Sequence, residues 1–308
     1  MRNRIMAVCL VSLLTACKEG AGPPPVPPSP PPASPSDIAF YSTKNGGDWD
    51  IYGMDSLGGH RINLTNDVWD DVDPAWSSDD KKIAFVSTRP PSSQYDIWVM
   101  NADGSSVRQL TNAPGADINP TWSPDGSKMA FASSRDGNLE IYVMNADGSG
   151  AMNITNNPAY DLEPAWSPDG RRIAFASERD GKRDIYVMNA DGSAPVNLTN
   201  NTATNESPAW SPDGQKIAFH SDSASSVALT FDVYVMNADG SAHTRLTTDP
   251  ASDYEAAWSP DGTRIVFVSL RNINPDLNSE IYVMQADGSA QRRLTVNQLP
   301  EHRPRWRH

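Results

Sequence analysis

The sequence predicts an all-β protein, a six-bladed β-propeller with four-stranded antiparallel blades, and three observations support this prediction. Each repeat unit contains four short segments rich in strand-forming residues and bounded by Gly, Pro, Asn or Asp. No segment keeps a 3.6-residue apolar period, so we expect no substantial helix. Tryptophans recur with spacings of 46, 44, 44, 48 and 48 residues, a period typical of propellers, at Trp76, Trp122, Trp166, Trp210, Trp258 and Trp306.

The unit around Trp166 illustrates the four segments. The first and second are joined by Pro168-Asp169-Gly170, in which Pro presets φ and Gly permits a positive φ. The third and fourth are joined by the hairpin sequence that runs from Asn189 to Ser193. The predicted strands are residues 164–167, 173–176, 184–188 and 196–199.

The order of segments at the two ends of the repeat region predicts how the ring closes. The region begins with a second segment at Ile38 and ends with a first segment at Trp306. We therefore expect the C-terminal strand to complete the first blade. Such a closure removes the open sheet edges that an unclosed array would leave.

The N-terminus has the pattern of an export signal. Arg2 and Arg4 precede an apolar run over residues 5–14, which is too short to span a bilayer. The run ends in Leu14-Thr15-Ala16-Cys17, which resembles the bacterial lipobox, where cleavage falls before a cysteine that becomes diacylated. The alternative is an ordinary signal peptide with an accidental cysteine. We expect a signal peptide over 1–16, a lipidated Cys17 with a linker over 17–36, and the propeller over 37–308.

The linker is rich in proline. Nine prolines between residues 18 and 36 favour polyproline II, which would extend roughly 60 Å. A stiff spacer is the first interpretation, and a ligand for a proline-recognition domain is the second. The resemblance to bacterial lipoproteins implies that Lys18, rather than an aspartate, after the lipidated cysteine directs the protein to the outer membrane. There the propeller would face the periplasm or the cell surface.

Charge and cysteine content exclude several classes of function. The formal net charge is −13, and removal of Arg2 and Arg4 would lower it to −15. A chain with this negative charge repels nucleic acid and anionic membrane surfaces. We therefore expect it to contact the membrane through the lipid alone. The only cysteines are Cys9 and Cys17, so nothing after residue 17 can form a disulfide or a cysteine metal site.

The repeated motifs resemble those of the TolB-type propeller family. Trp-Ser-Pro-Asp-Gly, small-Phe, Ile-Tyr-Val-Met and Asn-Ala-Asp-Gly-Ser carry the resemblance, which covers residues 37–308. It implies the propeller fold and says little of function, because such blades serve many roles. TolB itself has an N-terminal α/β domain and is soluble in the periplasm, whereas here a proline-rich linker takes that domain's place. The resemblance therefore does not carry over the Tol-system role.

Two sets of charged residues recur at one mouth of the predicted channel. Five residues before the tryptophans stand Asp71, Asp117, Asp161, Asn205, Asp253 and Glu301. The loop between the second and third segments opens at the same end and carries Lys44, Arg89, Arg135, Arg179, Ser223 and Arg271. The two sets vary together, because the unit that has Asn205 in place of an acid also has Ser223 in place of a base. We expect structural ion pairs, namely Asp71–Arg89, Asp117–Arg135, Asp161–Arg179, Asp253–Arg271 and Glu301–Lys44. Exposed pairs contribute only about 0–1 kcal/mol, so we expect them to position loops. The alternative is a cation or basic-peptide site formed by the acids.

A less regular set is the predicted binding surface at the channel mouth. It lies three residues before the tryptophans and comprises Asp73, Asn119, Glu163, Ser207, Glu255 and Arg303. Irregularity fits a ligand without sixfold symmetry, although varied surface chemistry without a role is the alternative. By contrast, an acid opens all six third segments, which indicates a scaffold role for Asp50, Asp96, Glu140, Asp184, Asp232 and Glu280.

Searches for catalytic and metal-binding patterns find none. The five histidines form no ligand pair, His220 occupies a strand position that favours packing, and no Gly-x-Ser-x-Gly motif occurs. We expect no enzyme activity, cofactor or metal, and a monomer that binds an envelope protein or peptide. Paired carboxylates leave a carbohydrate-active or glycan-binding propeller as one alternative, and a structural scaffold is the other.

The lipobox generates the first testable prediction. Cys17→Ser should release the protein from membranes, because the sequence contains no other candidate membrane segment. Fractionation of cells expressing the wild type and the variant measures this, with Cys9→Ser as the matched control. An unchanged membrane fraction for Cys17→Ser would contradict the anchor.

Overall fold

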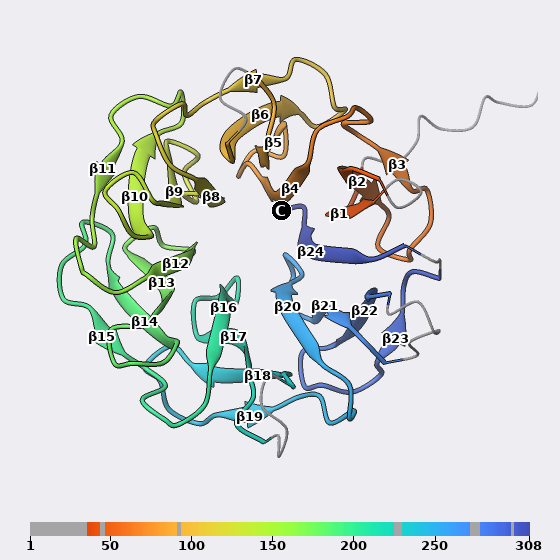
Figure 1. Cartoon of the computed structure of the whole chain (residues 1–308). Coiled ribbons are helices and arrows are strands. Elements are labelled where there is room, and N and C mark those ends of the chain that lie inside the picture. Colours follow the sequence, from red (N-terminus) through yellow and green to blue (C-terminus); the bar gives the residue numbers. More distant parts are fainter. Residues whose placement is uncertain (1–35, 44–46, 91–93, 225–229, 272–277, 297–298) are drawn as a thin grey trace, which may run out of the picture. The chain divides into compact units, whose positions relative to one another are not determined.

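Six sheets of four antiparallel strands surround a central channel in the part of the chain that the structure describes (Figure 1). The structure is a computed structural model, and it describes residues 36–43, 47–90, 94–224, 230–271, 278–296 and 299–308. Cys17, the predicted signal peptide, the linker before residue 36 and Lys44 lie outside these ranges. Within them the chain forms strands and turns, and it contains no helix that could span a bilayer. The fold class predicted from the repeats is confirmed.

The strands have nearly the same lengths in every blade. The first strands line the channel and are β4 (Asp71–Trp76), β8 (Asp117–Trp122), β12 (Asp161–Trp166), β16 (Asn205–Trp210), β20 (Asp253–Trp258) and β24 (Glu301–Trp306). The second strands are β1 (Ile38–Thr43), β5 (Lys82–Ser87), β9 (Lys128–Ser133), β13 (Arg172–Ser177), β17 (Lys216–Ser221) and β21 (Arg264–Ser269). The third strands are β2 (Trp49–Met54), β6 (Asp96–Asn101), β10 (Glu140–Asn145), β14 (Asp184–Asn189), β18 (Asp232–Asn237) and β22 (Glu280–Gln285). The fourth strands are β3 (Ile62–Asn63), β7 (Arg108–Gln109), β11 (Met152–Asn153), β15 (Val196–Asn197), β19 (Thr244–Arg245) and β23 (Arg292–Arg293).

The C-terminal strand closes the ring, as the segment order predicts. The first blade has the strand order β24-β1-β2-β3, so its inner strand comes from the other end of the chain. Strand β24 pairs with β1 in a register that sets Ile38 opposite Trp306 and Ser42 opposite Glu301. In Figure 1 the two ends of the colour scale, red β1 and dark blue β24, therefore lie in one blade.

The core lies between neighbouring blades and repeats around the ring. One cluster joins Ile185 and Val187 of one blade to Trp210, Ile217 and Phe219 of the next. The second-strand phenylalanines are at most 1% exposed. Each buried phenylalanine contributes about 1.5–3 kcal/mol. Because both faces of each sheet pack against neighbours, the second and third strands read as nearly continuous apolar runs.

A buried polar contact fixes the two-residue fourth strands. The Thr199 hydroxyl donates to Asp184 (2.6 Å) and accepts from the backbone N–H of Ile185 (3.0 Å). The same threonine-to-backbone contact occurs in all six blades, at Thr65, Thr111, Thr155, Thr199, Thr247 and Thr295. This contact fits the scaffold role expected for the third-strand acids.

Each first strand contains a bulge that determines the lining of the channel. In the blade of β12 and β13, the pairing register shifts between Leu162 and Ala165. The residue three positions before the tryptophan adopts a left-handed backbone in every blade, with φ between 50° and 56°, at Asp73, Asn119, Glu163, Ser207, Glu255 and Arg303. A β-bulge redirects a side chain out of the normal alternation. Here the bulge brings one side chain per blade to the channel.

The closure generates the second prediction. Deleting residues 303–308 removes most of β24 and should lower the melting temperature strongly, because loss of the Trp306 side chain alone costs about 3–5 kcal/mol. Thermal unfolding of the purified protein measures this. Deleting residues 307–308 alone is the control and should have a much smaller effect. Equal stability of the two truncated chains would refute the closure.

Candidate functional site

The six bulge residues form a network of ion pairs and hydrogen bonds across the channel. The Arg303 guanidinium lies 2.7 Å from Glu163, 3.2 Å from Glu255 and 3.3 Å from Asp73, which belong to three different blades. The backbone N–H of Arg303 also donates to Glu255 (2.8 Å). Asn119 donates to Asp73 (2.8 Å), and the Ser207 hydroxyl donates to Glu163 (2.9 Å). We call these six residues the channel network.

The electrostatics of the network favour its charged form. Burial acts to lower the pKa of the Arg303 guanidinium, but the carboxylates of Asp73, Glu163 and Glu255 outweigh it and raise that pKa. Burial likewise acts to raise the pKa of Glu255, but Arg303 and His302 hold it below its usual value. The arginine and Glu255 therefore remain charged at neutral pH.

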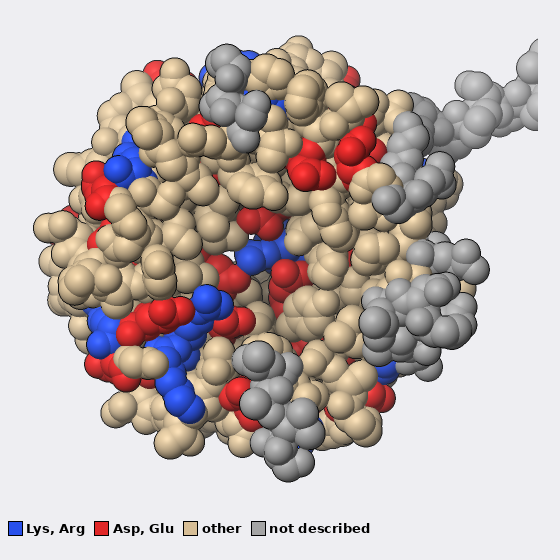
Figure 2. Space-filling view, in the orientation of Figure 1, with Lys and Arg blue, Asp and Glu red and all other residues tan. Residues whose placement is uncertain are grey.

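The network differs from the binding surface predicted for these six residues. Their side chains are largely buried and contact one another, with Asn119 and Ser207 at 8% and 5% exposure. The bulge explains the difference, because it directs the residues across the channel. The network instead separates two cavities, and four of its members (Asp73, Asn119, Glu163 and Arg303) line both. In Figure 2 basic atoms lie in the central hollow with acidic atoms beside them.

The first cavity, of about 510 Å³, opens at the mouth where the loops between second and third strands emerge. We call it the aromatic mouth. Its wall includes Tyr41, Trp49, Tyr95, Leu139 and Leu162. The ring of Tyr41 stacks on His302 with centroids 5.3 Å apart and meets Trp49 edge-on at 5.2 Å. Tyr95 is 42% exposed, so an aromatic surface faces solvent here.

The wall becomes polar towards the fourth and fifth repeat units. Arg183 forms ion pairs with Glu206 and with Glu178 (2.9 Å). Glu206 in turn contacts Nε2 of the buried His220 at 3.1 Å. His220 also packs edge-on against Phe231 with centroids 4.8 Å apart, in line with the packing expected of it. The mouth thus has an apolar, aromatic side and a charged side.

Two sequence positions create this asymmetry, and neither was among the predicted site residues. The first precedes the third-strand acid and holds Trp49, Tyr95, Leu139, Arg183, Phe231 and Ser279. The second follows the first-strand acid and holds Val72, Ile118, Leu162, Glu206, Tyr254 and His302. Both vary from blade to blade directly beside an acidic position that scarcely changes, and that contrast could have revealed them.

Ser279, His302 and Glu255 lie in an order that resembles a nucleophile, a base and an acid. The Ser279 hydroxyl lies 3.3 Å from Nε2 of His302, whose Nδ1 is 3.9 Å from Glu255. Yet the same hydroxyl donates to the backbone carbonyl of Glu301 (2.9 Å), and Ser279 is 2% exposed. Glu255 is bound to Arg303. These contacts hold β24 in place and leave the hydroxyl unavailable as a nucleophile.

Four of the five expected ion pairs involve described residues, and the structure brings the partners together. Arg89–Asp71 and Arg179–Asp161 are 2.7 Å apart, Arg135–Asp117 is 2.9 Å and Arg271–Asp253 is 2.5 Å. The expectation that the pairs are exposed is wrong, because all four aspartates are 0% exposed. Burial raises the pKa of Asp161, and Ser177 and Arg179 oppose that shift.

In the first blade, a positive charge from a different position in the repeat pairs with the first-strand acid. Glu301, which the sequence paired with Lys44, forms an ion pair with Arg61 at the start of the fourth strand. The Arg61 guanidinium lies 4.3 Å above the ring of Tyr52, as that of Arg135 lies 4.6 Å above Tyr142. Arg61 therefore supplies the positive charge from a different loop, and Lys44 lies outside the described residues.

Three carboxylates gather beside one of these pairs. Oxygen atoms of Asp50, Asp67 and Asp71 lie within 4.8 Å of one another. Burial raises the pKa of Asp71 to about 7, although Arg89 opposes the shift. Arg89 is also paired with Asp67, with Nε to oxygen at 3.2 Å. The chain thus supplies a positive charge to this cluster itself.

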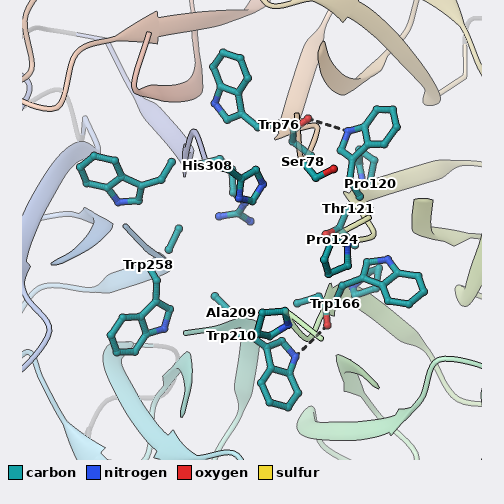
Figure 3. A pocket seen from close by; sticks show the side chains of 18 of the residues that line it. Trp76, Ser78, Pro120, Thr121, Pro124, Trp166, Ala209, Trp210, Trp258 and His308 are labelled. Atoms are coloured by element: carbon teal, nitrogen blue, oxygen red, sulfur yellow. Dashed lines mark hydrogen bonds between the residues drawn. The ribbon is translucent and has the colours of Figure 1, made fainter. Parts of the chain in front are cut away.

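The second cavity, of about 530 Å³, lies on the other side of the channel network. The tryptophans that end the first strands surround it, together with prolines two residues before them (Figure 3). Trp122 and Trp210 donate from their indole N–H groups to the carbonyls of Ala75 and Ala165, each at 3.2 Å. We call this cavity the tryptophan chamber.

Known protein families and solved structures contain repeats similar to those of this chain. The sequence profile of the TolB beta propeller domain family matches residues 97–231 and 198–308. A search of curated proteins found no match. Among solved structures, TolB from Acinetobacter baumannii is 24% identical with a TM-score of 0.76 and covers 88% of this chain, which spans 66% of that protein. A putative TolB from Agrobacterium tumefaciens is 23% identical with a TM-score of 0.68, over 84% of this chain and 89% of its own. An oligogalacturonate lyase from Vibrio parahaemolyticus is 13% identical with a TM-score of 0.57, and the match covers 83% of this chain and 74% of the lyase.

The buried ion pairs generate the third prediction. Asp161→Asn and Arg179→Ser should each destabilise the protein by about 1–3 kcal/mol, because each leaves a desolvated charge without its partner. The double variant reproduces Asn205 and Ser223 of the neighbouring blade, so it should cost less than the sum. Denaturant unfolding of the four proteins measures the coupling, which we expect to exceed about 0.5 kcal/mol.

The same double-mutant cycle distinguishes a cation site from ion pairing. Repeating it with added calcium should leave the free energies of unfolding unchanged. Additive single effects, or a rise in stability with calcium that grows in Arg179→Ser, would favour a cation site over pairing.

Proposed function

Because the chain belongs to the TolB beta propeller domain family, we propose that it is a binding module, held in the bacterial cell envelope by a lipid on Cys17, that recognises a protein or peptide at the aromatic mouth. The observation that carries this proposal is the asymmetry of the mouth. Tyr41, Trp49 and Tyr95 offer an apolar wall, and Arg183 and Glu206 offer charges on the other side.

This combination fits a polypeptide ligand. Binding sites in proteins are mostly apolar with a few polar groups that fix orientation, and energetically dominant interface residues are enriched in Trp, Tyr and Arg. Tyr95, Val68 and Tyr160 stand on three different loops at this end of the propeller and are 42%, 70% and 48% exposed, so exposed apolar side chains also occur on the loops outside the cavity. The channel network provides a fixed floor, because its polar groups are engaged with one another.

The envelope location rests on the N-terminal sequence. The lipobox ending at Cys17 and the proline-rich linker would hold the propeller away from a membrane surface. A tethered binding module of this kind would capture a partner near the membrane without any contact between the acidic propeller and the lipid headgroups.

The mouth generates the fourth prediction. The full-length protein carrying Trp49→Ala and Tyr95→Ala should lose at least tenfold of the partner that the wild type recovers from cross-linked envelope extracts. The matched control carries Met152→Ala and Val196→Ala, which remove apolar side chains that are 64% and 55% exposed on fourth strands. Quantitative mass spectrometry of the recovered proteins measures the difference, and thermal unfolding confirms that both variants fold.

Three outcomes count against the proposal. Equal recovery by the mouth variant and the control would move the contact to another surface. Absence of any partner enriched by the wild type would contradict a protein-binding role. Retention of an envelope oligosaccharide in place of a protein would favour the glycan-binding alternative.

A further inference from the structure

The tryptophan chamber contains one arginine that the repeat does not require. The position immediately before each tryptophan holds a small residue in five blades, at Ala75, Thr121, Ala165, Ala209 and Ala257. In the first blade, whose inner strand is β24, it holds Arg305, which lines the chamber. A repeat that elsewhere places a methyl or hydroxyl group here thus places a guanidinium in a single blade.

Arg305 lacks the carboxylate partners that its neighbours have. Arg303 contacts three carboxylates, and Arg307 lies 3.6 Å from Asp80. No carboxylate of the described residues lies within 4.0 Å of Arg305. Within the described ranges, the one hydrogen bond of its guanidinium runs from Nη1 to the carbonyl of the adjacent Pro304, at 3.2 Å. Most of the five N–H donors of this guanidinium therefore have no acceptor from the chain.

The surroundings make this arrangement costly for the isolated protein. Burial, and then the charge of Arg303, lower the pKa of Arg305, and the carboxylates of the channel network oppose that shift only in part. A half-buried cation without a paired carboxylate loses part of its hydration and gains no ion pair in return, and replacement by a small residue would relieve that cost. A bound anion would relieve the cost as well, by supplying acceptors in the planar geometry that guanidinium prefers.

The rest of the chamber indicates what else the ligand carries. Its walls are rings of tryptophan and proline, seen around the open space in Figure 3 at Trp76, Trp166, Trp210, Trp258, Pro120 and Pro124. The channel network closes its inner end. A volume of about 530 Å³ admits a small molecule or one to three residues of a peptide end.

We propose that the tryptophan chamber binds a carboxylate attached to an apolar or aromatic group, with Arg305 pairing with the carboxylate and the indole and proline rings enclosing the apolar part. The ligand is a small organic acid or the C-terminus of a polypeptide, which present the same chemistry. This site lies on the far side of the channel network from the aromatic mouth, so it stands independently of the function proposed for that mouth.

Titration calorimetry with two pairs of probes tests the site. Phenylacetate and phenylacetamide differ only in the charged group, as do the tripeptide Gly-Gly-Phe with a free C-terminus and its amide. The wild type should bind at least one of the acids and neither of the amides. Arg305→Ala should weaken that binding at least tenfold, and Arg305→Lys should lie between the two. Arg183→Ala, which removes a charge from the aromatic mouth, is the matched control and should bind as the wild type does.

Thermal unfolding provides a second readout that does not depend on the choice of probe. Without ligand, Arg305→Ala should melt at a higher temperature than the wild type, because a half-buried charge without a paired carboxylate is gone and five blades already have a small residue there. The bound acid should raise the melting temperature of the wild type and leave Arg305→Ala unchanged.

Preference for the peptide would assign the ligand to a polypeptide C-terminus, and preference for phenylacetate would assign it to a free acid. The proposal is overturned if neither acid binds the wild type, if Arg305→Ala binds as tightly as the wild type, or if that variant melts lower without ligand. Loss of partner capture at the aromatic mouth has no bearing on these results.

Discussion

The contact of Arg303 with three carboxylates is the interaction on which the architecture of the channel depends. One guanidinium from the last strand reaches Asp73, Glu163 and Glu255, and so links four blades across the axis of the ring. It requires both closure by β24, which brings the arginine into the ring, and the bulge, which brings the side chains to the channel. Without it, three carboxylates would face the channel with no ion-pair partner. With it, the channel becomes two cavities with different chemistry, one aromatic and charged, the other lined by tryptophan and proline.

The buried charges are better understood as determinants of geometry than as sources of stability. Desolvation of an ion pair can offset most of its Coulomb energy, so well-packed apolar residues often stabilise as much. What the Asp–Arg pairs do is define loop positions, because each arginine lies over its own blade's aromatic rings while it binds the first strand. In the blade with Asn205 the amide donates to Asp184 (3.2 Å) and to Asn201 (3.1 Å), so hydrogen bonds from an uncharged side chain take over that task.

The sequence predicted the features that every blade repeats and missed those that depend on contacts between blades. Blade number, strand order and the Asp–Arg pairs follow from spacing, since each is local to one repeat, and closure follows from the order of the segments at the two ends of the repeat region. The channel network did not follow, because a left-handed residue at Asp73 or Glu163 cannot be recognised from its side chain. Arg61 was missed for a related reason. It lies before the fourth strand, whereas the other blades use an arginine between the second and third strands, and only the fold shows that Arg61 reaches Glu301. The aromatic mouth was within reach, since Trp49, Tyr95 and Arg183 directly precede an acid that every blade repeats.

Closure of the ring by its last strand also determines when the molecule can finish folding. Ile38 and Trp306 are paired although 267 residues lie between them in the sequence, so the first blade lacks its inner strand until β24 has been synthesised. Contacts so distant in sequence form slowly, because the entropy of closing the intervening loop must be overcome first. Until then β1 presents an unpaired edge, which is the kind of surface that recruits other chains. The nascent protein is therefore exposed to association with other chains through the edge of β1. This exposure ends only when β24, the strand that carries Arg303, pairs with β1.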